Sequence, residues 1–147
     1  MGKIVYVDMD NVLVNFKSEI EKLNKDIVKK YDSRLDEVPG IFSLMEPMKG
    51  ALDAYEKISK KFDTYILSTS PWKNPSAWSD KLLRVQKYLG AFARKRLILT
   101  HHKNLNMGDY LIDDRKKRGA DKFQGELILF GSEDFPDWRV VLEYLFK

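Results

Sequence analysis

The sequence predicts an α/β fold in which a mainly parallel sheet is covered by helices on both faces. Short runs of β-branched and aromatic residues alternate with longer segments of helical periodicity, which is typical of strands joined by helical crossovers. Several of the apolar runs also end directly in acidic or hydroxyl residues. Because ligands of open parallel sheets bind at the carboxyl ends of the strands, these polar residues are the candidates for function.

Size and composition indicate one globular domain over residues 1–147. The chain has 147 residues, of which 44% are hydrophobic and 12% aromatic, enough for a core of its own. It contains no cysteine, which excludes disulfides, thiolate metal sites and cysteine nucleophiles. No apolar run approaches the roughly 18 to 20 residues of a membrane span, and no signal pattern opens the chain. We therefore expect a soluble, cytoplasmic protein without a membrane partner.

The charge balance favours an anionic small molecule. The formal net charge is +4, a mild excess of positive charge. This excess suits anionic ligands but is smaller than nucleic-acid-binding domains usually carry. We expect a small phosphate ester as the substrate and no stable nucleic-acid partner.

The first half of the chain predicts a strand, a helix and an irregular insertion. Residues 3–8 form a β-branched and aromatic run that ends in an acid, which indicates a buried strand. Apolar residues recur every three or four positions over residues 16–31, which predicts one amphipathic helix. Prolines and glycines punctuate residues 32–50. We therefore expect a small helical cap at about residues 16–48, inserted after the first strand.

The second half alternates between helices and strands. We expect helices at about residues 50–61, 76–89 and 138–146, and strands at residues 62–68, 97–99, 110–112 and 127–130. Pro136 suits the first turn of the last helix. This alternation favours parallel strands, because helical crossovers return the chain to the same end of the sheet.

Two carboxylates, Asp8 and Asp10, follow the first predicted strand. Side chains two positions apart on an extended chain project to the same side, so these carboxylates converge. Two carboxylates that close need a cation such as Mg²⁺, or a shared proton and one raised pKa. For a lone pair of this kind a simpler interpretation is favoured, in which Asp8 caps the next helix and Asp10 is a solvated loop acid.

Further polar groups follow later strands. Thr69 and Ser70 come at the end of the second one, where hydroxyl and backbone N–H groups can bind phosphate oxygens, although such a run also fits a cap or a turn. The pair Asp113-Asp114 supplies the hard oxygen ligands that Mg²⁺ requires. Two lysines, at positions 81 and 103, can neutralise phosphate charge, but each alone would be an ordinary surface residue.

The order of these groups resembles the haloacid dehalogenase-like (HAD) phosphatase superfamily, whose fold is Rossmann-like. That superfamily has a DxD after the first strand, a Ser or Thr after a later strand, a Lys, and then an acidic pair. The segments DMDNVLVNF, LSTSPW, LTHHK and LIDDR, with Trp78 and Lys81 ahead of KYLG, are more narrowly similar to the 5′(3′)-deoxyribonucleotidase family. The resemblance extends from about Lys3 to Arg115.

The resemblance implies a role for each acid. Asp8 would be the nucleophile that forms an aspartyl-phosphate. Asp10 would protonate the leaving alkoxide and then deprotonate the attacking water. Mg²⁺ would be bound by the Asp8 side chain, the Asp10 backbone carbonyl and the acidic pair, with Asp114 as the direct ligand and Asp113 in support.

The resemblance also implies which residues bind the phosphate. Thr69 and Ser70 would hold the phosphoryl oxygens, and Lys81 would stabilise the aspartyl-phosphate and its transition state. Lys103 and, more weakly, His101 match positions that face the phosphate in the family. The chain departs from the family pattern in three places: Asn11 replaces Gly or Thr, His101 stands where an arginine is expected, and the cap is short. Asparagine tolerates unusual backbone angles, so its substitution is mild.

Aromatic residues beside the expected phosphate site suggest a nucleobase pocket. Aromatic faces stack on bases for about 1–3 kcal/mol each. Phe42 and Trp72 are the residues we expect to line such a pocket, although aromatic residues at helical spacing more often belong to the core.

The sequence therefore predicts a Mg²⁺-dependent phosphatase of 5′- or 3′-deoxyribonucleoside monophosphates. Two alternatives within the enzymes are a phosphatase of another small phosphorylated metabolite and one of nucleic-acid 3′ ends. An open, basic mouth would favour the polynucleotide end, and a closed aromatic pocket would favour a free nucleotide. Two alternatives lie outside the enzymes. One is a phospho-accepting regulatory domain, although its acidic pair would normally come early in the chain, whereas here it comes late. The other is a non-catalytic relic, although such a chain would not be expected to keep every catalytic position.

Overall fold

A five-stranded parallel sheet forms the centre of the protein. The computed structural model describes residues 2–147. The strands are β1 (Ile4–Val7), β4 (Asp63–Ser68), β5 (Leu97–Leu99), β6 (Tyr110–Asp113) and β7 (Glu126–Leu129). Their order across the sheet is β5-β4-β1-β6-β7, and every neighbouring pair is parallel. The predicted α/β fold with a mainly parallel sheet is therefore confirmed, and β1 lies in its middle.

Three α-helices pack against one face of this sheet, and a short helical turn near Ala120 packs against the other. The three α-helices are α3 (Ala51–Lys61), α4 (Pro75–Tyr88) and α5 (Trp138–Leu145). Helices α3 and α5 pack together, and buried residues of α3, α4 and α5 share one cluster with Val5 and Val7 of β1, so all three helices lie on the same face of the sheet. On the opposite face, Ala120 and Phe123 pack against Tyr6. Helix α5 begins where the Asp137 side chain accepts a hydrogen bond from the Val140 N–H, which satisfies one free donor of the first turn. None of the helices in residues 2–147 combines the length and the apolar character that crossing a bilayer requires.

The core explains why β1 holds its position. Val5 and Val7 are fully buried and pack into the cluster beneath α3 and α5. Tyr6 points to the opposite face, where it packs with Leu67 and Leu111. Because β1 is buried on both faces, its side chains pack on each side of the sheet and hold the strand in place. The residues that follow β1 therefore start from a fixed position.

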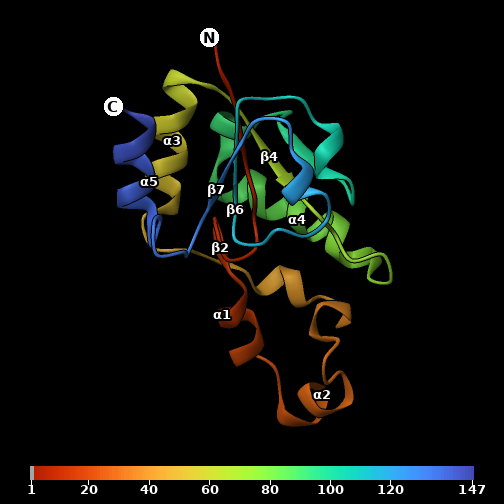
Figure 1. Cartoon of the computed structure of the whole chain (residues 1–147). Coiled ribbons are helices and arrows are strands. Elements are labelled where there is room, and N and C mark those ends of the chain that lie inside the picture. Colours follow the sequence, from red (N-terminus) through yellow and green to blue (C-terminus); the bar gives the residue numbers. More distant parts are fainter. Residues whose placement is uncertain (1) are drawn as a thin grey trace.

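The insertion after β1 folds over the carboxyl end of the sheet (Figure 1). It contains a two-stranded antiparallel ribbon, β2 (Val14–Asn15) with β3 (Glu46–Pro47), two α-helices, α1 (Phe16–Glu21) and α2 (Lys25–Lys30), and two 3-10 turns, η1 (Leu35–Glu37) and η2 (Ile41–Leu44). Three further 3-10 turns lie in the rest of the chain, at η3 (Gly90–Ala93), η4 (Lys103–Leu105) and η5 (Ala120–Lys122).

The prediction of one continuous helix over residues 16–31 was wrong. The chain leaves helical geometry after α1, and the Asn24 side chain accepts a hydrogen bond of 2.9 Å from the Ile27 N–H to start α2. Asparagine satisfies a free N–H of a first turn better than it supports a helix interior, so it divides the segment in two. The β2–β3 ribbon was not predicted.

Candidate active site

Three carboxylates meet at the carboxyl edge of the sheet. Asp8 follows β1 and Asp113 ends β6, and the two strands are joined there by a hydrogen bond of 2.9 Å from the Asp8 N–H to the Ile112 carbonyl. Asp8 and Asp113 are buried and Asp114 is half-buried. One oxygen from each of the three lies within 4.8 Å of the others. Oxygens this close fit the coordination of a hard cation, so the cluster could hold a metal ion.

Burial disfavours the charged forms of these acids. It raises the pKa of Asp8 to about 7, an effect that Lys103 opposes and that Asp113 and Asp10 strengthen. Burial likewise raises the pKa values of Asp113 and Asp114. A bound cation would favour the ionised carboxylates, so the chemistry of the cluster depends on its positive neighbours.

Lys103 is the first of these positive neighbours. Its ammonium donates to the Asp8 carboxylate at 3.1 Å and to Asp113 at 2.6 Å. The side chain is buried, which by itself lowers its pKa, but the two carboxylates outweigh burial and the pKa is raised. Lys103 therefore stays charged beside Asp8.

Lys81 is the second positive neighbour, and it contacts Asp10. This lysine comes from α4, is 0% exposed, and donates to Asp10 at 3.2 Å. It also donates to the Ser68 hydroxyl at 2.9 Å and to the Thr69 carbonyl at 2.7 Å. The other Asp10 oxygen is buried and has no hydrogen-bond partner among the described residues. Asp10 therefore has one oxygen held by a cation and one available for other chemistry.

Asn11 makes the turn that directs Asp10 and the residues after it. Its φ of 62° lies in the left-handed region. The expectation that asparagine suits an unusual backbone here is confirmed. Its side-chain amide also donates to Asp114 at 3.5 Å and accepts from the Phe16 N–H at 3.4 Å, so it links the acidic cluster to the start of α1.

Two residues with hydroxyl side chains, Thr69 and Ser70, follow β4, the strand that pairs with β1 in the sheet. The Thr69 hydroxyl donates to the Thr100 carbonyl at 2.7 Å. The Ser70 hydroxyl is buried and has no partner within the described part of the chain. A buried hydroxyl without a partner is rare and marks a place where an acceptor would be stabilised.

A cleft of about 730 Å³ opens between the insertion and the sheet. Asp10 and Thr69 lie in its wall, and so do three of the predicted substrate-binding residues, Phe42, Trp72 and His101. Ser70, Lys81 and Lys103 do not line this cleft, although Lys103 lines a narrow recess beside it that reaches Asp8. Phe42 stacks on Phe16 with ring centres 5.6 Å apart, but it is only 1% exposed.

His101 lies between two tryptophans. Its ring centre is 6.1 Å from that of Trp72 and 6.2 Å from that of Trp78. The Trp78 indole donates to the Pro71 carbonyl at 3.1 Å, which fixes the loop that carries Trp72. His101 therefore contacts aromatic rings at the cleft, and Trp72 is 81% exposed.

Three site features were missed by sequence reasoning. The Ser68 hydroxyl accepts a hydrogen bond from Lys81, a contact that the run of hydroxyl residues at the end of the second predicted strand did not indicate. Glu19 on α1 is 0% exposed, neither of its oxygens has a hydrogen-bond partner in residues 2–147, and burial raises its pKa to about 9. Arg118 lines both the cleft and the recess. Only Arg118 had a visible signal, the four consecutive basic residues 115–118.

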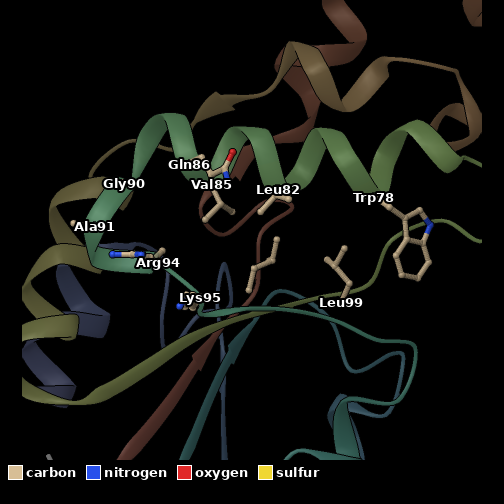
Figure 2. A pocket seen from close by; sticks show the side chains of 11 residues that line it. Trp78, Leu82, Val85, Gln86, Gly90, Ala91, Arg94, Lys95 and Leu99 are labelled. Atoms are coloured by element: carbon tan, nitrogen blue, oxygen red, sulfur yellow. The ribbon is translucent and has the colours of Figure 1, made fainter.

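A separate hollow of about 960 Å³ lies between α4 and β5, away from the acids. Figure 2 shows Leu82, Val85 and Leu99 around it, with Trp78 at one end and Arg94 and Lys95 at the other. None of its lining residues carries a carboxylate or a hydroxyl group. Its chemistry therefore does not match the candidate active site.

Comparisons with known proteins agree on one family. The family described as 5′ nucleotidase, deoxy (Pyrimidine), cytosolic type C protein matches residues 30–136. A Vibrio phage KVP40 protein named as a 5′(3′)-deoxyribonucleotidase is 59% identical over 142 residues, which cover 97% of this chain and 84% of that protein. The human 5′(3′)-deoxyribonucleotidase of cytosolic type is 30% identical over 94% of this chain and 78% of its own length.

A solved structure shows the same fold. A HAD-hydrolase of Bacillus subtilis, whose crystal structure contains magnesium, superposes with a TM-score of 0.68 over 97% of this chain and 98% of that chain. The identity is 11%, so this likeness supports the fold and not the substrate.

Proposed function

The chain belongs to the 5′(3′)-deoxyribonucleotidase family of HAD phosphatases, and we propose that it hydrolyses 5′- or 3′-deoxyribonucleoside monophosphates with Mg²⁺ through an aspartyl-phosphate. The observation that carries the proposal is the convergence of Asp8 and Asp10 with the buried ammonium groups of Lys103 and Lys81. Catalysis of phosphoryl transfer requires that the reacting groups are positioned and that the charge on the phosphoryl oxygens is stabilised, and this arrangement of acids and cations can do both. The cytosolic type of the human relative supports a cytoplasmic location.

Asp8 is the proposed nucleophile of the first half-reaction. One of its carboxylate oxygens attacks phosphorus, and the bond between phosphorus and the ester oxygen breaks. Lys103 favours the ionised form that this attack requires, because its ammonium lies 3.1 Å from the carboxylate. Asp10 gives its proton to the leaving sugar oxygen, so the deoxynucleoside departs as an alcohol.

The second half-reaction regenerates Asp8. A water molecule attacks the phosphorus of the aspartyl-phosphate while Asp10 takes one of its protons. The bond between phosphorus and the Asp8 oxygen breaks, and inorganic phosphate is released. The hydrogen bond of 3.2 Å from Lys81 holds Asp10 in place in both steps.

The acidic cluster fits a magnesium ion. Asp8, Asp113 and Asp114 offer carboxylate oxygens within 4.8 Å of one another, and hard oxygen ligands are those that Mg²⁺ prefers. We propose that the Asp8 side chain, the Asp10 carbonyl and Asp114 bind the ion, with Asp113 in support. When bound, Mg²⁺ cancels the repulsion between a carboxylate nucleophile and an anionic ester.

The remaining site residues are proposed to bind the substrate. Thr69 and Ser70 hold phosphoryl oxygens, which is consistent with the unpartnered Ser70 hydroxyl. Lys81 and Lys103 stabilise the charge that spreads over the phosphoryl group. The base occupies the cleft lined by Phe42 and Trp72, with His101 at its wall.

Phosphate release tests this function. Wild-type protein and Asp8→Asn are each given 5′- and 3′-deoxyribonucleotides, ribonucleotides, sugar phosphates and an aryl phosphate, with Mg²⁺ or with EDTA. We expect magnesium-dependent release that favours deoxyribonucleotides and disappears in Asp8→Asn. Release from sugar phosphates alone would contradict the nucleotide assignment, and no release from any ester would contradict the enzyme.

A further inference from the structure

The loop after the acidic pair places four cations at the mouth of the site. Residues Arg115, Lys116, Lys117 and Arg118 are consecutive and exposed. Among the described residues, none of their side chains forms an ion pair within 4.0 Å. Like charges this close repel one another, and an anion between them would relieve that repulsion. The loop is therefore suited to binding an anion.

These cations face the same space as the catalytic acids. Arg115 and Arg118 line the cleft that contains Asp10 and Thr69. Together with Lys117 they also line the recess that reaches Asp8. Lys73 lies in the wall of the cleft as well. These positive side chains thus line the approach to the phosphate site from the loops of the sheet, whereas Asp36 and Glu37 line it from the insertion.

The backbone fixes the loop at this place. Arg118 has a φ of 57°, in the left-handed region that non-glycine residues rarely adopt. Its carbonyl accepts a hydrogen bond of 2.8 Å from the N–H of Lys103, the lysine that contacts Asp8. Such uncommon conformations persist where the surroundings hold them, and they concentrate at functional sites.

One phosphate group does not account for all these cations. The reacting phosphate already has Lys81 and Lys103, both buried beside the acids. The exposed cations lie further from the acids than these two lysines, in the walls of the cleft and the recess. A second phosphate of the same substrate would lie there. Trp72, 81% exposed at the same cleft, presents an aromatic face of the kind on which single-stranded bases stack.

We propose that Arg115, Lys117 and Arg118 bind a second, non-reacting phosphate group of the substrate. The substrate class is then a deoxynucleotide that carries a phosphate or phosphodiester in addition to the terminal phosphate that is removed. This inference rests on the proposed phosphatase activity. The second phosphate can come from a nucleoside 3′,5′-bisphosphate or from the end of a single-stranded deoxyoligonucleotide.

Three substrates with the same base test the inference. They are deoxythymidine 5′-monophosphate, deoxythymidine 3′,5′-bisphosphate and a 5′-phosphorylated dithymidylate, compared by kcat/KM with Mg²⁺ at several salt concentrations. We expect at least one of the two substrates with a second phosphate to be preferred over the monophosphate, with a steeper salt dependence. Preference for the dithymidylate identifies a strand end, and preference for the bisphosphate identifies a small molecule.

A charge-removing variant assigns this preference to the loop. Lys117→Gln combined with Arg118→Asn removes two cations, and asparagine tolerates the left-handed backbone at position 118. We expect the ratio of kcat/KM for the preferred substrate to kcat/KM for the monophosphate to fall roughly tenfold. Lys49→Gln combined with Lys87→Gln removes the same charge at exposed positions outside the cleft and should keep the preference. Absence of any preference, or equal loss in both double variants, overturns the inference.

Binding separates this inference from the proposed function. The Asp8→Asn protein is titrated with the same three compounds and Mg²⁺, and the dissociation constants are compared. Tighter binding of a compound with a second phosphate supports the second-phosphate site even where the wild type releases no phosphate. Equal binding of all three, in a wild type that hydrolyses the monophosphate, overturns the second-phosphate site and leaves the phosphatase intact.

Discussion

The ammonium group of Lys81 donates a hydrogen bond of 3.2 Å to the carboxylate of Asp10, across 71 residues of sequence. The same group binds the Ser68 hydroxyl and the Thr69 carbonyl, so each of its three protons has an acceptor. It also lies 4.7 Å from the centre of the Phe42 ring. Lys81 therefore joins three parts of the site: the acid after β1, the end of β4 and the insertion.

Replacing Lys81 by methionine should separate its charge from its volume. We expect kcat to fall by roughly 10²–10³-fold, the loss seen when one donor to a developing charge is removed. Steady-state kinetics on a deoxyribonucleotide measures this loss. Lys87→Met, on the exposed side of the same helix, is the matched control. Unchanged kcat in Lys81→Met would show that Lys81 has only a structural role.

Replacing Lys103 by methionine should move the acidic limb of the pH profile. Burial raises the pKa of Asp8 to about 7, and Lys103 opposes that rise. Asp8 attacks as the carboxylate, so activity is present above its pKa and is lost as the pH falls through it. Without Lys103 the pKa rises further, and activity should disappear at a higher pH than in the wild type. Bound Mg²⁺ would lower the pKa of Asp8 in both proteins, so the dependence of kcat/KM on pH is compared at one fixed Mg²⁺ concentration. A limb that stays in place or moves to lower pH in the variant contradicts the prediction.

The sheet could be predicted because its signals are local. A parallel strand such as β1 is buried on both faces, so it appears as an uninterrupted apolar run, and the acid at its end is visible in the same few residues. The helix break at Asn24 could not be predicted from periodicity, since the apolar spacing continues across it.

The burial of the two lysines could not be predicted in the same way. Lys81 and Lys103 are 0% and 3% exposed, although lysines are almost always at the surface. Their burial depends on carboxylates that are distant in sequence, such as Asp10 and Asp8. The β2–β3 ribbon is another case, because each strand has only two residues and its partner lies far along the chain. The roles of the site residues remain predictions.

Magnesium should stabilise the folded protein through the acidic cluster. A ligand that binds only the folded state at 100 times its dissociation constant contributes about 2.7 kcal/mol. We expect the melting temperature to rise with Mg²⁺ and to return to its starting value with EDTA. Asp114→Asn should lose most of this rise, whereas Asp109→Asn, outside the cluster, should keep it. A rise of equal size in both variants would place the ion elsewhere.

Replacing Trp72 by alanine should weaken nucleotide binding without harming the fold. The side chain is 81% exposed, so little packing is lost. Stacking on a base contributes about 1–3 kcal/mol, so KM for a deoxyribonucleotide should rise roughly tenfold. KM for a generic aryl phosphate serves as the comparison, and Trp72→Phe should recover most of the loss. Equal KM values in wild type and Trp72→Ala would remove Trp72 from the pocket.

Glu19 should make the stability of the protein depend on pH. Its carboxyl group is fully buried without a hydrogen-bond partner among residues 2–147. Burial raises its pKa from 4.5 to about 9, with a further rise from Asp10, against the opposing effects of Lys81 and Lys22. The folded state therefore holds a proton that the unfolded state releases above about pH 4.5. The free energy of unfolding should fall as the pH rises from there towards about 9, by on the order of 1 kcal/mol per pH unit.

Glu19→Gln isolates this contribution, because glutamine keeps the shape and carries no titrating proton. We expect the free energy of unfolding of the variant to rise relative to that of the wild type as the pH rises from 5 to 9. Only the wild type must keep a proton on Glu19 in the folded state that its unfolded state releases. Urea unfolding at several pH values measures the difference. Glu21→Gln, exposed on the same helix, should show no such trend. A constant difference between Glu19→Gln and the wild type across this range would mean that Glu19 does not hold its proton in the folded state, and that another cation compensates its buried charge.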